Sequence, residues 1–302
     1  MFSNSSEDQQ MRLLHSVITH SSDAVLITEA DPLNAPGPRI VYVNDAFCRM
    51  TGYSSQEVMG RNPRMLHGPN TNPDHVHRLS QALKLQEPIE ISLINYKKNG
   101  EEFWNHINIS PVFDNNGICT HFIAIERDIT HLKFRELQKT LLADISALFF
   151  QDYSLQTSLK HVADLLINQM SFDFTEIWNF NTEDYSLNLL AKAAISPDFE
   201  KFYQDLERQF NIDQGLPGLI WRDKKMHIWD NLQLIPEFHR RKAAEETGLR
   251  TMIGIPLMSK GNMVGVVLIG LKRKLADKGL YSYLFERLGD HLGSEMERKR
   301  LE

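Results

Sequence analysis

The sequence predicts an α+β fold of two domains, each a central antiparallel sheet with flanking helices, joined by a long helical linker. A length of 302 residues suits two hydrophobic cores, because single cores seldom extend beyond ~250–300 residues. In each half, alternating apolar segments meet at turn sequences, "KNG" and "DNNG" in the first half and "KGN" in the second. Between the halves, the apolar residues change to helical spacing.

The first half begins with a helix near residues 11–20, within an N-terminal segment that spans 1–22. Gly, Pro, Asn and Asp separate the apolar segments that follow, as expected for one sheet with helices inserted between its strands. The expected strands are 24–28, 39–43, 89–97, 102–113 and 118–129, and the expected helices are 44–52 and 73–86. We therefore expect the first domain to span residues 23–130.

The predicted linker, residues 131–151, carries an apolar stripe whose members are three and four residues apart. These residues are Phe134, Leu137, Leu141, Ile145 and Leu148. A seam between two copies of the chain and the buried side of a packed surface helix both give this spacing. We favour the seam, so the linker is predicted to connect the domains and to pair two copies.

The second half is predicted to contain a domain over residues 152–279 and a C-terminal signalling helix over 280–302. The expected elements are a helix at 154–170, strands near 174–180 and 186–194, a helix around 197–209, and two strands around the "KGN" turn. The final helix places Tyr281, Leu284, Phe285, Leu288, Leu292 and Met296 on one face. Its polar end predicts a further domain beyond it.

Composition and motifs exclude several classes of function. The net charge of −6 argues against a broad nucleic-acid surface. The N-terminus lacks the pattern of a signal peptide, and no apolar stretch approaches the ~20 residues of a membrane span, so we expect a cytoplasmic protein. Only two cysteines are present, Cys48 and Cys119, which excludes a disulfide framework and a thiolate zinc site. The histidines show no metal-ligand spacing beyond "HVH" at 75–77, which we expect on a helix surface.

Three polar residues interrupt the apolar faces of neighbouring strands. Asn95 and Asn105 lie on such faces of adjacent strands, and Glu126 lies in matching phase on the third. A buried amide without a partner costs roughly 1–3 kcal/mol, so each amide requires a hydrogen bond. Either the amides bond to each other or to loop backbone, or they bind a planar ligand with alternating donors and acceptors.

The segments "VYVNDAFCRMTGYSSQEVMGRN", "LINYKKNGEEFWN" and "ISPVFDNNG" resemble a PAS domain of the LOV (light, oxygen, voltage) subclass, the flavin-mononucleotide blue-light sensors. The resemblance extends from about Asp23 to Thr130. It implies that Asn62 and Arg64, in "GRNPRMLHGPN", bind the cofactor and that Asn95 and Asn105 contact the pyrimidine edge of the flavin.

Four other positions depart from the pattern of that family. Pro63 replaces the reactive cysteine, so the light-driven thiol adduct cannot form. Ser80 replaces a second phosphate-binding arginine, and Arg78 is a weak substitute. His67 and Glu126 replace glutamines. A buried Glu126 with a raised pKa could donate or exchange a proton beside a flavin, whereas an ionised one would repel the flavin carbonyl. It could also pair with His67 in an empty pocket.

The expected cofactor-binding residues are therefore Asn62, Arg64, His67, Asn95, Asn105 and Glu126, with no catalytic or metal-binding residues. Flavin mononucleotide (FMN) binding and a flavin-free relay domain both remain open. If flavin binds, the signal must pass through reduction or proton transfer.

The segments "DQGLPGLIW", "FHRRKAAEETGLRTMIGIPL" and "SKGNMVGVVLIG" resemble a GAF domain over roughly 152–275. The resemblance implies a fold and leaves the small-molecule ligand undefined. A covalent bilin is not expected, because residues 120–302 contain no cysteine. Scattered parts of a cyclic-nucleotide signature are present at Asp230, Asn231, Phe238 and Glu245, and a different metabolite or no ligand is also compatible with the sequence.

These features predict the sensory part of a larger signalling protein, without a catalytic motif of its own. We expect a parallel homodimer with a spine of helices near 11–20, 131–150 and 280–299. A change in the PAS pocket would pass through the helix at His131 and the GAF domain to a C-terminal effector, such as a histidine kinase or a nucleotide cyclase. The alternatives are a ligand-free dimerisation scaffold and an enzyme that uses Glu126 and His67 as an acid–base pair.

Overall fold

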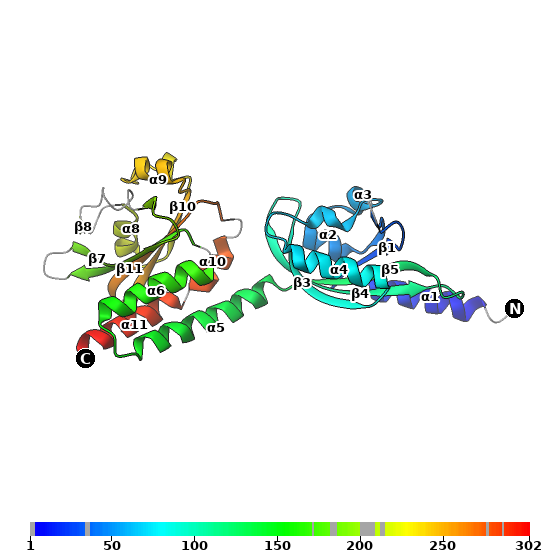
Figure 1. The fold of residues 1–302 in the computed structure, drawn as a ribbon, viewed down its shortest axis with the longest axis horizontal. Coiled ribbons are helices and arrows are strands. Elements are labelled where there is room, and N and C mark those ends of the chain that lie inside the picture. The colour runs from blue at the N-terminus through cyan, green and yellow to red at the C-terminus, as the bar shows by residue number, and fades with distance from the viewer. Residues whose placement is uncertain are drawn as a thin grey trace. The chain divides into compact units, whose positions relative to one another are not determined.

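A computed structural model of the chain describes residues 4–33, 37–170, 172–181, 186–199, 209–211, 215–275, 278–285 and 287–302 (Figure 1). The chain divides into two compact units, Met1–Lys133 and Phe134–Glu302. Each unit is built on one antiparallel sheet with flanking helices, which confirms the predicted α+β class. The finer boundaries of the linker and terminal segments stay predictions.

The sheet of unit 1 has the strand order β2-β1-β5-β4-β3 and is antiparallel throughout. Its strands are β1 (Ala24–Glu29), β2 (Ile40–Val43), β3 (Ile89–Tyr96), β4 (Glu102–Phe113) and β5 (Cys119–Asp128). Both predicted hairpins are present. Gly100 and Gly117 adopt φ values of +83° and +77° in their turns, a region in which a side chain is strained.

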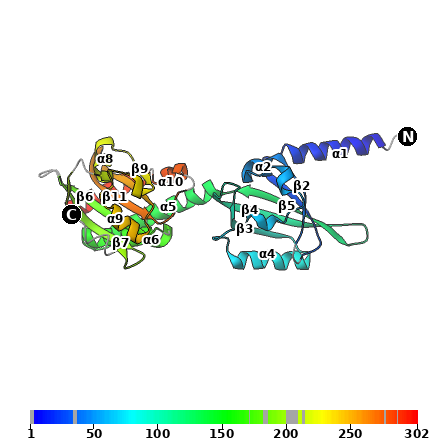
Figure 2. The ribbon, with the colours of Figure 1, turned by 90° about the horizontal axis from the view of Figure 1, so that it is seen from above.

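The helical segments of unit 1 are α1 (Asn4–Thr19), α2 (Asp45–Thr51), α3 (Ser55–Val58), the 3-10 helix η1 (Pro63–Leu66) and α4 (Pro73–Leu85). Asn44 caps α2 by accepting a hydrogen bond from the Phe47 backbone N–H, and Gly52 ends it in the left-handed region. The sequence did not predict α3 and η1, because a single turn is too short to show helical periodicity. Helix α4 packs against β3 and covers part of the sheet (Figure 2).

The sheet of unit 2 has the strand order β8-β7-β6-β11-β10-β9. Its strands are β6 (Phe174–Asn181), β7 (Ser186–Ala194), β8 (Gln209–Asn211), β9 (His227–Asp230), β10 (Thr251–Ser259) and β11 (Asn262–Leu271). The predicted strands at 174–180 and 186–194 and the hairpin at "KGN" are confirmed. Residues 200–208 of the helix predicted around 197–209 lie outside the described residues.

Two helical layers cover the two faces of this sheet (Figure 1). One layer contains α5 (Thr130–Phe149), α6 (Leu155–Met170), α10 (Lys278–Phe285) and α11 (Leu288–Leu301). The other contains α8 (Gly215–Asp223), η2 (Leu232–Leu234) and α9 (Arg241–Thr247). Each layer forms its own hydrophobic cluster with one side of the sheet.

Two of the five stripe residues, Leu141 and Ile145, are buried inside unit 2, and Phe134, Leu137 and Leu148 are half-buried against the same cluster. Leu141, Ile145 and Phe149 are each at most 1% exposed and belong to the same cluster as Leu288 and Leu292. The prediction that this stripe is a seam between two copies is therefore wrong, and the alternative of a packed helix is correct. The physical reason is that α5 and α11 together supply the apolar surface that covers this face of the sheet.

The predicted C-terminal helix is divided into α10 and α11. Helix α10 ends at Phe285, and the carbonyl groups of Tyr283 and Leu284 accept hydrogen bonds from the side chain of Gln138. This side chain satisfies carbonyl groups that the last turn of a helix leaves without partners. The apolar stripe itself was predicted correctly as one face, but that face is buried in unit 2.

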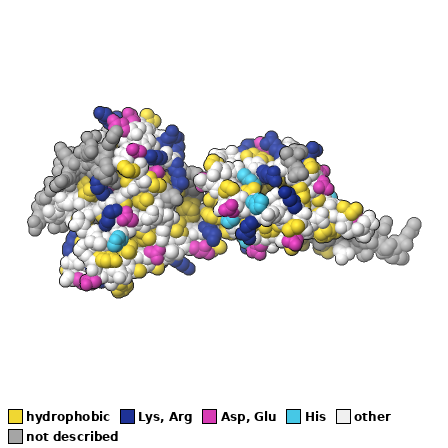
Figure 3. Space-filling view, viewed as in Figure 1, with side chains coloured by type: hydrophobic (Ala, Val, Ile, Leu, Met, Phe, Trp, Pro, Cys, Tyr) yellow, Lys and Arg dark blue, Asp and Glu magenta, His cyan; other side chains and the backbone are white. Residues whose placement is uncertain are grey.

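The surfaces of the two units carry mixed charge, with basic and acidic side chains both present on the face of each unit drawn in Figure 3. Within the part of the chain that the structure describes, no helix is both long enough and apolar enough to cross a lipid bilayer.

Candidate functional site

A cavity of about 90 Å³ lies in unit 1, between the inner face of the sheet, η1 and α4. Its wall is mainly apolar. The apolar lining residues include Leu26, Leu33, Leu66, Val76, Leu79, Leu83, Ile107, Ile109, Phe122 and Ala124. The polar lining side chains therefore stand out as groups that can orient a bound molecule.

One side of the cavity is formed by η1 and the residues next to it. The Asn62 side chain caps η1 by accepting a hydrogen bond of 2.9 Å from the Arg64 backbone N–H. Pro63 occupies the first position of η1, where its fixed φ is compatible with the turn. A Cβ atom at Gly37, where φ is +86°, would lie 1.9 Å from Asn62 Nδ2, so this approach requires glycine. Asn62, Pro63 and Arg64 all line the cavity.

The sheet side of the cavity carries a buried polar wall formed by Asn95, Asn105 and Glu126, which are 2%, 0% and 3% exposed. Asn105 Nδ2 donates to Asn95 Oδ1 at 2.9 Å and to Glu126 Oε2 at 2.8 Å. Asn95 Nδ2 donates to the carbonyl of Leu66 at 3.2 Å, which connects the wall to η1. Asn105 Oδ1 is buried and has no hydrogen-bond partner among the described residues.

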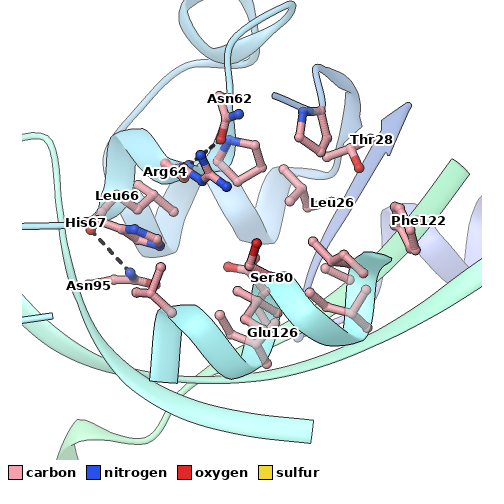
Figure 4. Close-up of a pocket in the computed structure, with 18 of the residues that line it drawn as sticks. Leu26, Thr28, Asn62, Arg64, Leu66, His67, Ser80, Asn95, Phe122 and Glu126 are labelled. Carbon is pink, nitrogen blue, oxygen red and sulfur yellow. Dashed lines mark hydrogen bonds between the residues drawn. The ribbon is translucent and has the colours of Figure 1, made fainter. Parts of the chain in front are cut away.

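Two titratable groups line the cavity from opposite elements, Glu126 on β5 and His67 at the end of η1 (Figure 4). Burial raises the pKa of Glu126 from its usual 4.5 to about 7, although the hydrogen bond from Asn105 opposes the shift. Burial, followed by the nearby Arg64 guanidinium, lowers the pKa of His67. A proton is therefore held by Glu126 more readily, and by His67 less readily, than in water.

The structure brings together most of the residues that the sequence singled out. Asn62, Arg64, His67, Asn95 and Glu126 line the cavity, and Pro63 and Ser80 line it as well. Asn105 is not a lining residue, but it contacts two of them. Glu126 bonds to Asn105, so the pairing with His67 that the sequence left open is not observed among the described residues. Arg78 is exposed and is not part of the lining that the structure describes.

The sequence did not single out Thr28, a buried lining residue on β1. Thr28 shares a strand face with the buried residues Ala24 and Leu26. A polar residue on an apolar face is the same signal that identified Asn95, so it could have been found. Leu33 and Pro38 come from the loop between β1 and β2, which carries no periodic signal.

Two contacts near Glu126 lie where the sheet of unit 1 joins α1 and α5. Arg127 points away from the cavity and forms a bidentate ion pair with Asp23, at 2.9 and 2.6 Å, just after α1. Thr130, the first residue of α5, accepts a hydrogen bond through Oγ1 from the Trp104 backbone N–H at 2.8 Å. The end of β5 therefore lies between two such contacts, one to the segment after α1 and one at the start of α5.

Unit 2 contains a buried ion pair between its sheet and the start of α9. Glu176 and Arg240 are joined by two hydrogen bonds of 2.7 and 3.0 Å on the sheet face below α9. Among the scattered signature residues, Asp230 bonds to Thr251 and Lys278, and Phe238 is part of the hydrophobic core. The structure thus gives these two residues ordinary packing and hydrogen-bonding roles.

Comparison with known families assigns the class of protein. Residues 22–131 match the model of the PAS domain, and residues 152–295 match the model of the GAF domain. The chain is therefore a tandem PAS–GAF sensory module of signal transduction.

Curated relatives resemble the PAS part of the chain. Blue-light-activated histidine kinases of Brucella canis and Brucella abortus are 48% identical over 95 residues, and that of Brucella anthropi is 44% identical over the same length. The match covers 32% of this chain and 19% of each relative. The chain therefore matches about a fifth of the length of these proteins.

Solved structures with similarity include the LOV domain of the Erythrobacter litoralis EL346 blue-light activated histidine kinase. It is 37% identical, with a TM-score of 0.34, and the alignment covers 36% of this chain and 96% of that domain. An RNA-binding light-oxygen-voltage receptor is 30% identical, with a TM-score of 0.38 and coverage of 41% of this chain and 34% of the receptor.

Proposed function

We propose that the PAS domain binds a flavin and senses its redox or protonation state without a thiol adduct, and that the chain relays this state to an effector. The observation that carries the proposal is the buried polar wall of Asn95, Asn105 and Glu126 on the sheet side of a mainly apolar cavity. Asn105 Oδ1 is a buried acceptor that has no partner within the described part of the chain, which costs about 1–3 kcal/mol unless a ligand supplies a donor.

The residues present fit the isoalloxazine ring of a flavin. Its pyrimidine edge offers an N–H donor between two carbonyl acceptors, and the carboxamides of Asn95 and Asn105 supply complementary acceptors and donors. The apolar lining from Leu66, Ile107 and Phe122 suits the faces of a planar ring. Asn62 and Arg64 lie on the opposite side and would hold the ribityl phosphate chain of FMN.

A bound flavin supplies reversible uptake of electrons and protons at this site. Glu126 would supply the protein's part of that chemistry, because its buried carboxyl holds a proton near neutral pH. A protonated Glu126 can donate a hydrogen bond to an acceptor in the cavity, whereas an ionised one only accepts. Pro63 lies where the resemblance places the reactive cysteine, so the proposed signal is a change of hydrogen bonding at Glu126.

The alternative function, a ligand-free interaction scaffold, is favoured by a different observation. Asn105 already donates hydrogen bonds to both Asn95 and Glu126, and the cavity is only about 90 Å³. In that case the polar wall stabilises an empty PAS core, and unit 1 acts only through the surface that it presents to partners.

Titration of the purified protein with FMN tests the proposal and separates it from the scaffold. Binding is expected to sharpen the visible absorption bands and to quench the flavin fluorescence. Replacement of Asn105 by Leu removes the polar contact and leaves Glu126 unpaired, so it is expected to weaken binding by roughly 10- to 100-fold. Asn108→Leu, an exposed position on the same strand, is the matched control and should bind FMN as the native protein does.

No spectral change with excess FMN in the native protein would contradict flavin binding and support the scaffold. Equal affinity of the Asn105→Leu variant would place a bound flavin elsewhere.

The similarity to histidine kinases suggests the class of effector that receives the signal. Because the match covers 19% of those relatives, we propose that this module regulates a kinase-type effector and has no enzymatic activity of its own. A cytoplasmic location and a parallel homodimer are parts of the same proposal. The dimer would use surfaces other than the buried stripe of α5. Sedimentation of the 302-residue chain over a range of concentrations tests the dimer directly.

A further inference from the structure

Hydrogen bonds join α5 to the C-terminal helices at three levels along its length. Near its start, Gln138 Nε2 donates to the carbonyls of Tyr283 and Leu284 at 2.7 and 3.0 Å. Gln138 is only 9% exposed, so both bonds are shielded from water. One side chain of α5 therefore caps the end of α10.

The middle and the end of α5 are joined to α11 in the same way. His291 Nε2 lies 2.9 Å from Ser146 Oγ and donates to the carbonyl of Leu142 at 3.1 Å. Arg298 donates to the carbonyl of Phe149 at 3.3 Å, at the last residue of α5. Lys299 donates to the carbonyl of Gln151 at 3.0 Å. Cationic groups at this position also complement the negative end of the α5 dipole.

Two glycines allow helix α11 to pack closely against the backbone of β10. A Cβ atom at Gly289 would lie 2.1 Å from the carbonyl oxygen of Pro256. A Cβ atom at Gly293 would lie 2.3 Å from that of Met258. Gly289 and Gly293 are four residues apart, so they occupy one side of the helix. Rotation of α11 about its axis would replace them with larger side chains and is sterically blocked.

We infer that α5 and α10–α11 form a rigid brace, so that displacement of α5 moves the C-terminal helix directly, without passing through the layer of α8, η2 and α9. The brace is defined by Gln138, Ser146, His291, Arg298 and Lys299. The hydrophobic cluster that α5 shares with α11 lies on one side of the sheet, and the cluster of α8, η2 and α9 lies on the other.

The sequence predicts that the signal passes in series from the PAS domain through the GAF domain to the effector. The brace instead gives the signal a direct route from α5 to α11. The GAF sheet would serve as the support that holds the brace, because the glycine contacts seat α11 closely on the backbone of β10. A ligand in the layer of α8 and α9 would act on the brace through the sheet, by way of β10 and β11. The inference concerns how the signal leaves the module and is independent of whether unit 1 binds flavin.

Hydrogen exchange of backbone amides, measured by mass spectrometry on the full 302-residue protein, tests the brace. Gln138→Leu removes both bonds to α10 and keeps a side chain of similar size at this buried position. Amides in α5 and in α10–α11 are expected to exchange roughly tenfold faster together, because two hydrogen bonds are lost. Amides in α8 and α9 are expected to change by less than about twofold. Lys139→Leu, at the exposed neighbouring position, is the matched control and should leave all of these rates unchanged.

His291→Phe provides a second test from the other helix, and it serves if Gln138→Leu does not fold. It removes the bond to the Leu142 carbonyl while keeping a planar ring, and it should accelerate exchange in α5 although the change is in α11. Acceleration confined to the substituted helix, or equal acceleration in α8 and α9, would overturn the brace. Because neither variant lies in unit 1 and no ligand is added, failure of this test is distinct from failure of flavin binding.

Discussion

Glu126 is the residue at which burial and chemistry conflict most strongly in unit 1. It is 3% exposed, faces an apolar cavity and has one described donor, Asn105. Its unfolded-state pKa is near 4.5, whereas burial raises the pKa in the folded state to about 7. The folded protein therefore binds this proton more tightly than the unfolded chain does, so stability from Glu126 is present below pH 4.5 and is lost as pH rises through about 7.

Replacement of Glu126 by Gln is expected to remove this pH dependence. In the ligand-free protein, the free energy of unfolding of unit 1 should fall by up to about 3 kcal/mol between roughly pH 5 and pH 8, and the Glu126→Gln variant should show a flatter profile. Chemical denaturation at several pH values measures the effect. Glu87→Gln, at an exposed position between α4 and β3, is the control. Parallel profiles for the native protein and Glu126→Gln would show that Glu126 does not hold a proton near neutral pH.

Pro63 gives a second prediction at the scale of one side chain. It lines the cavity from the first position of η1, so Pro63→Cys would place a thiol in the wall next to a bound flavin. With FMN bound, blue light is expected to bleach the visible absorption of this variant, with recovery in the dark. Pro63→Ser has a similar size without the thiol and should not show the effect. A bleaching response in both variants would indicate photochemistry that does not use the thiol.

The sequence allowed the polar wall to be predicted because a strand repeats every two residues. Asn95 and Asn105 on apolar strand faces were sufficient to place their side chains inward. The hydrogen bonds among them could not be predicted in the same way. Whether Glu126 would meet Asn105 or His67 depends on the register of β4 and β5 and on where η1 lies, and sequence periodicity specifies neither.

At the scale of elements, α5 shows why an apolar stripe does not identify its own partner. Ile145 is fully buried in unit 2, although its spacing equally suits a coiled coil. The sequence predicted the helix and its apolar face, and both are confirmed. The partner, α11, is more than a hundred residues away along the chain, so only the tertiary structure could supply it.

Truncation of Ile145 distinguishes the two roles of the stripe. Ile145→Ala is expected to destabilise unit 2 by about 2–5 kcal/mol, because it leaves a cavity in a closed core. Tryptophan fluorescence during chemical denaturation measures this, since Trp178, Trp221 and Trp229 all lie in unit 2. Leu132→Ala, a 44% exposed position on the same helix, should cost much less. If the loss of stability instead depended on protein concentration, Ile145 would belong to a contact between copies.

At the scale of the whole chain, the two units are connected through a continuous α5 that begins at Thr130 and is buried in unit 2 from Leu141 on. Glu126 lies four residues before α5, on the strand whose Arg127 is paired with Asp23, and Thr130 at the start of α5 is bonded to Trp104 of β4. A change of hydrogen bonding at Glu126 therefore has a short covalent path to α5. The brace then gives α5 a direct connection to α11.

Chemical reduction of the FMN-loaded protein tests this path from one end of the module to the other. Reduction alters the charge and protonation inside the cavity, so β5, α5 and α11 are expected to change their amide exchange rates together. In the Glu126→Leu variant, flavin that remains bound should still be reduced, but the response in α5 and α11 should disappear. A response in β5 that stops before α5 would limit the signal to unit 1. A response of equal size in α8 and α9 would restore the relay through the GAF sheet, because a displacement carried by the brace does not require that layer to move.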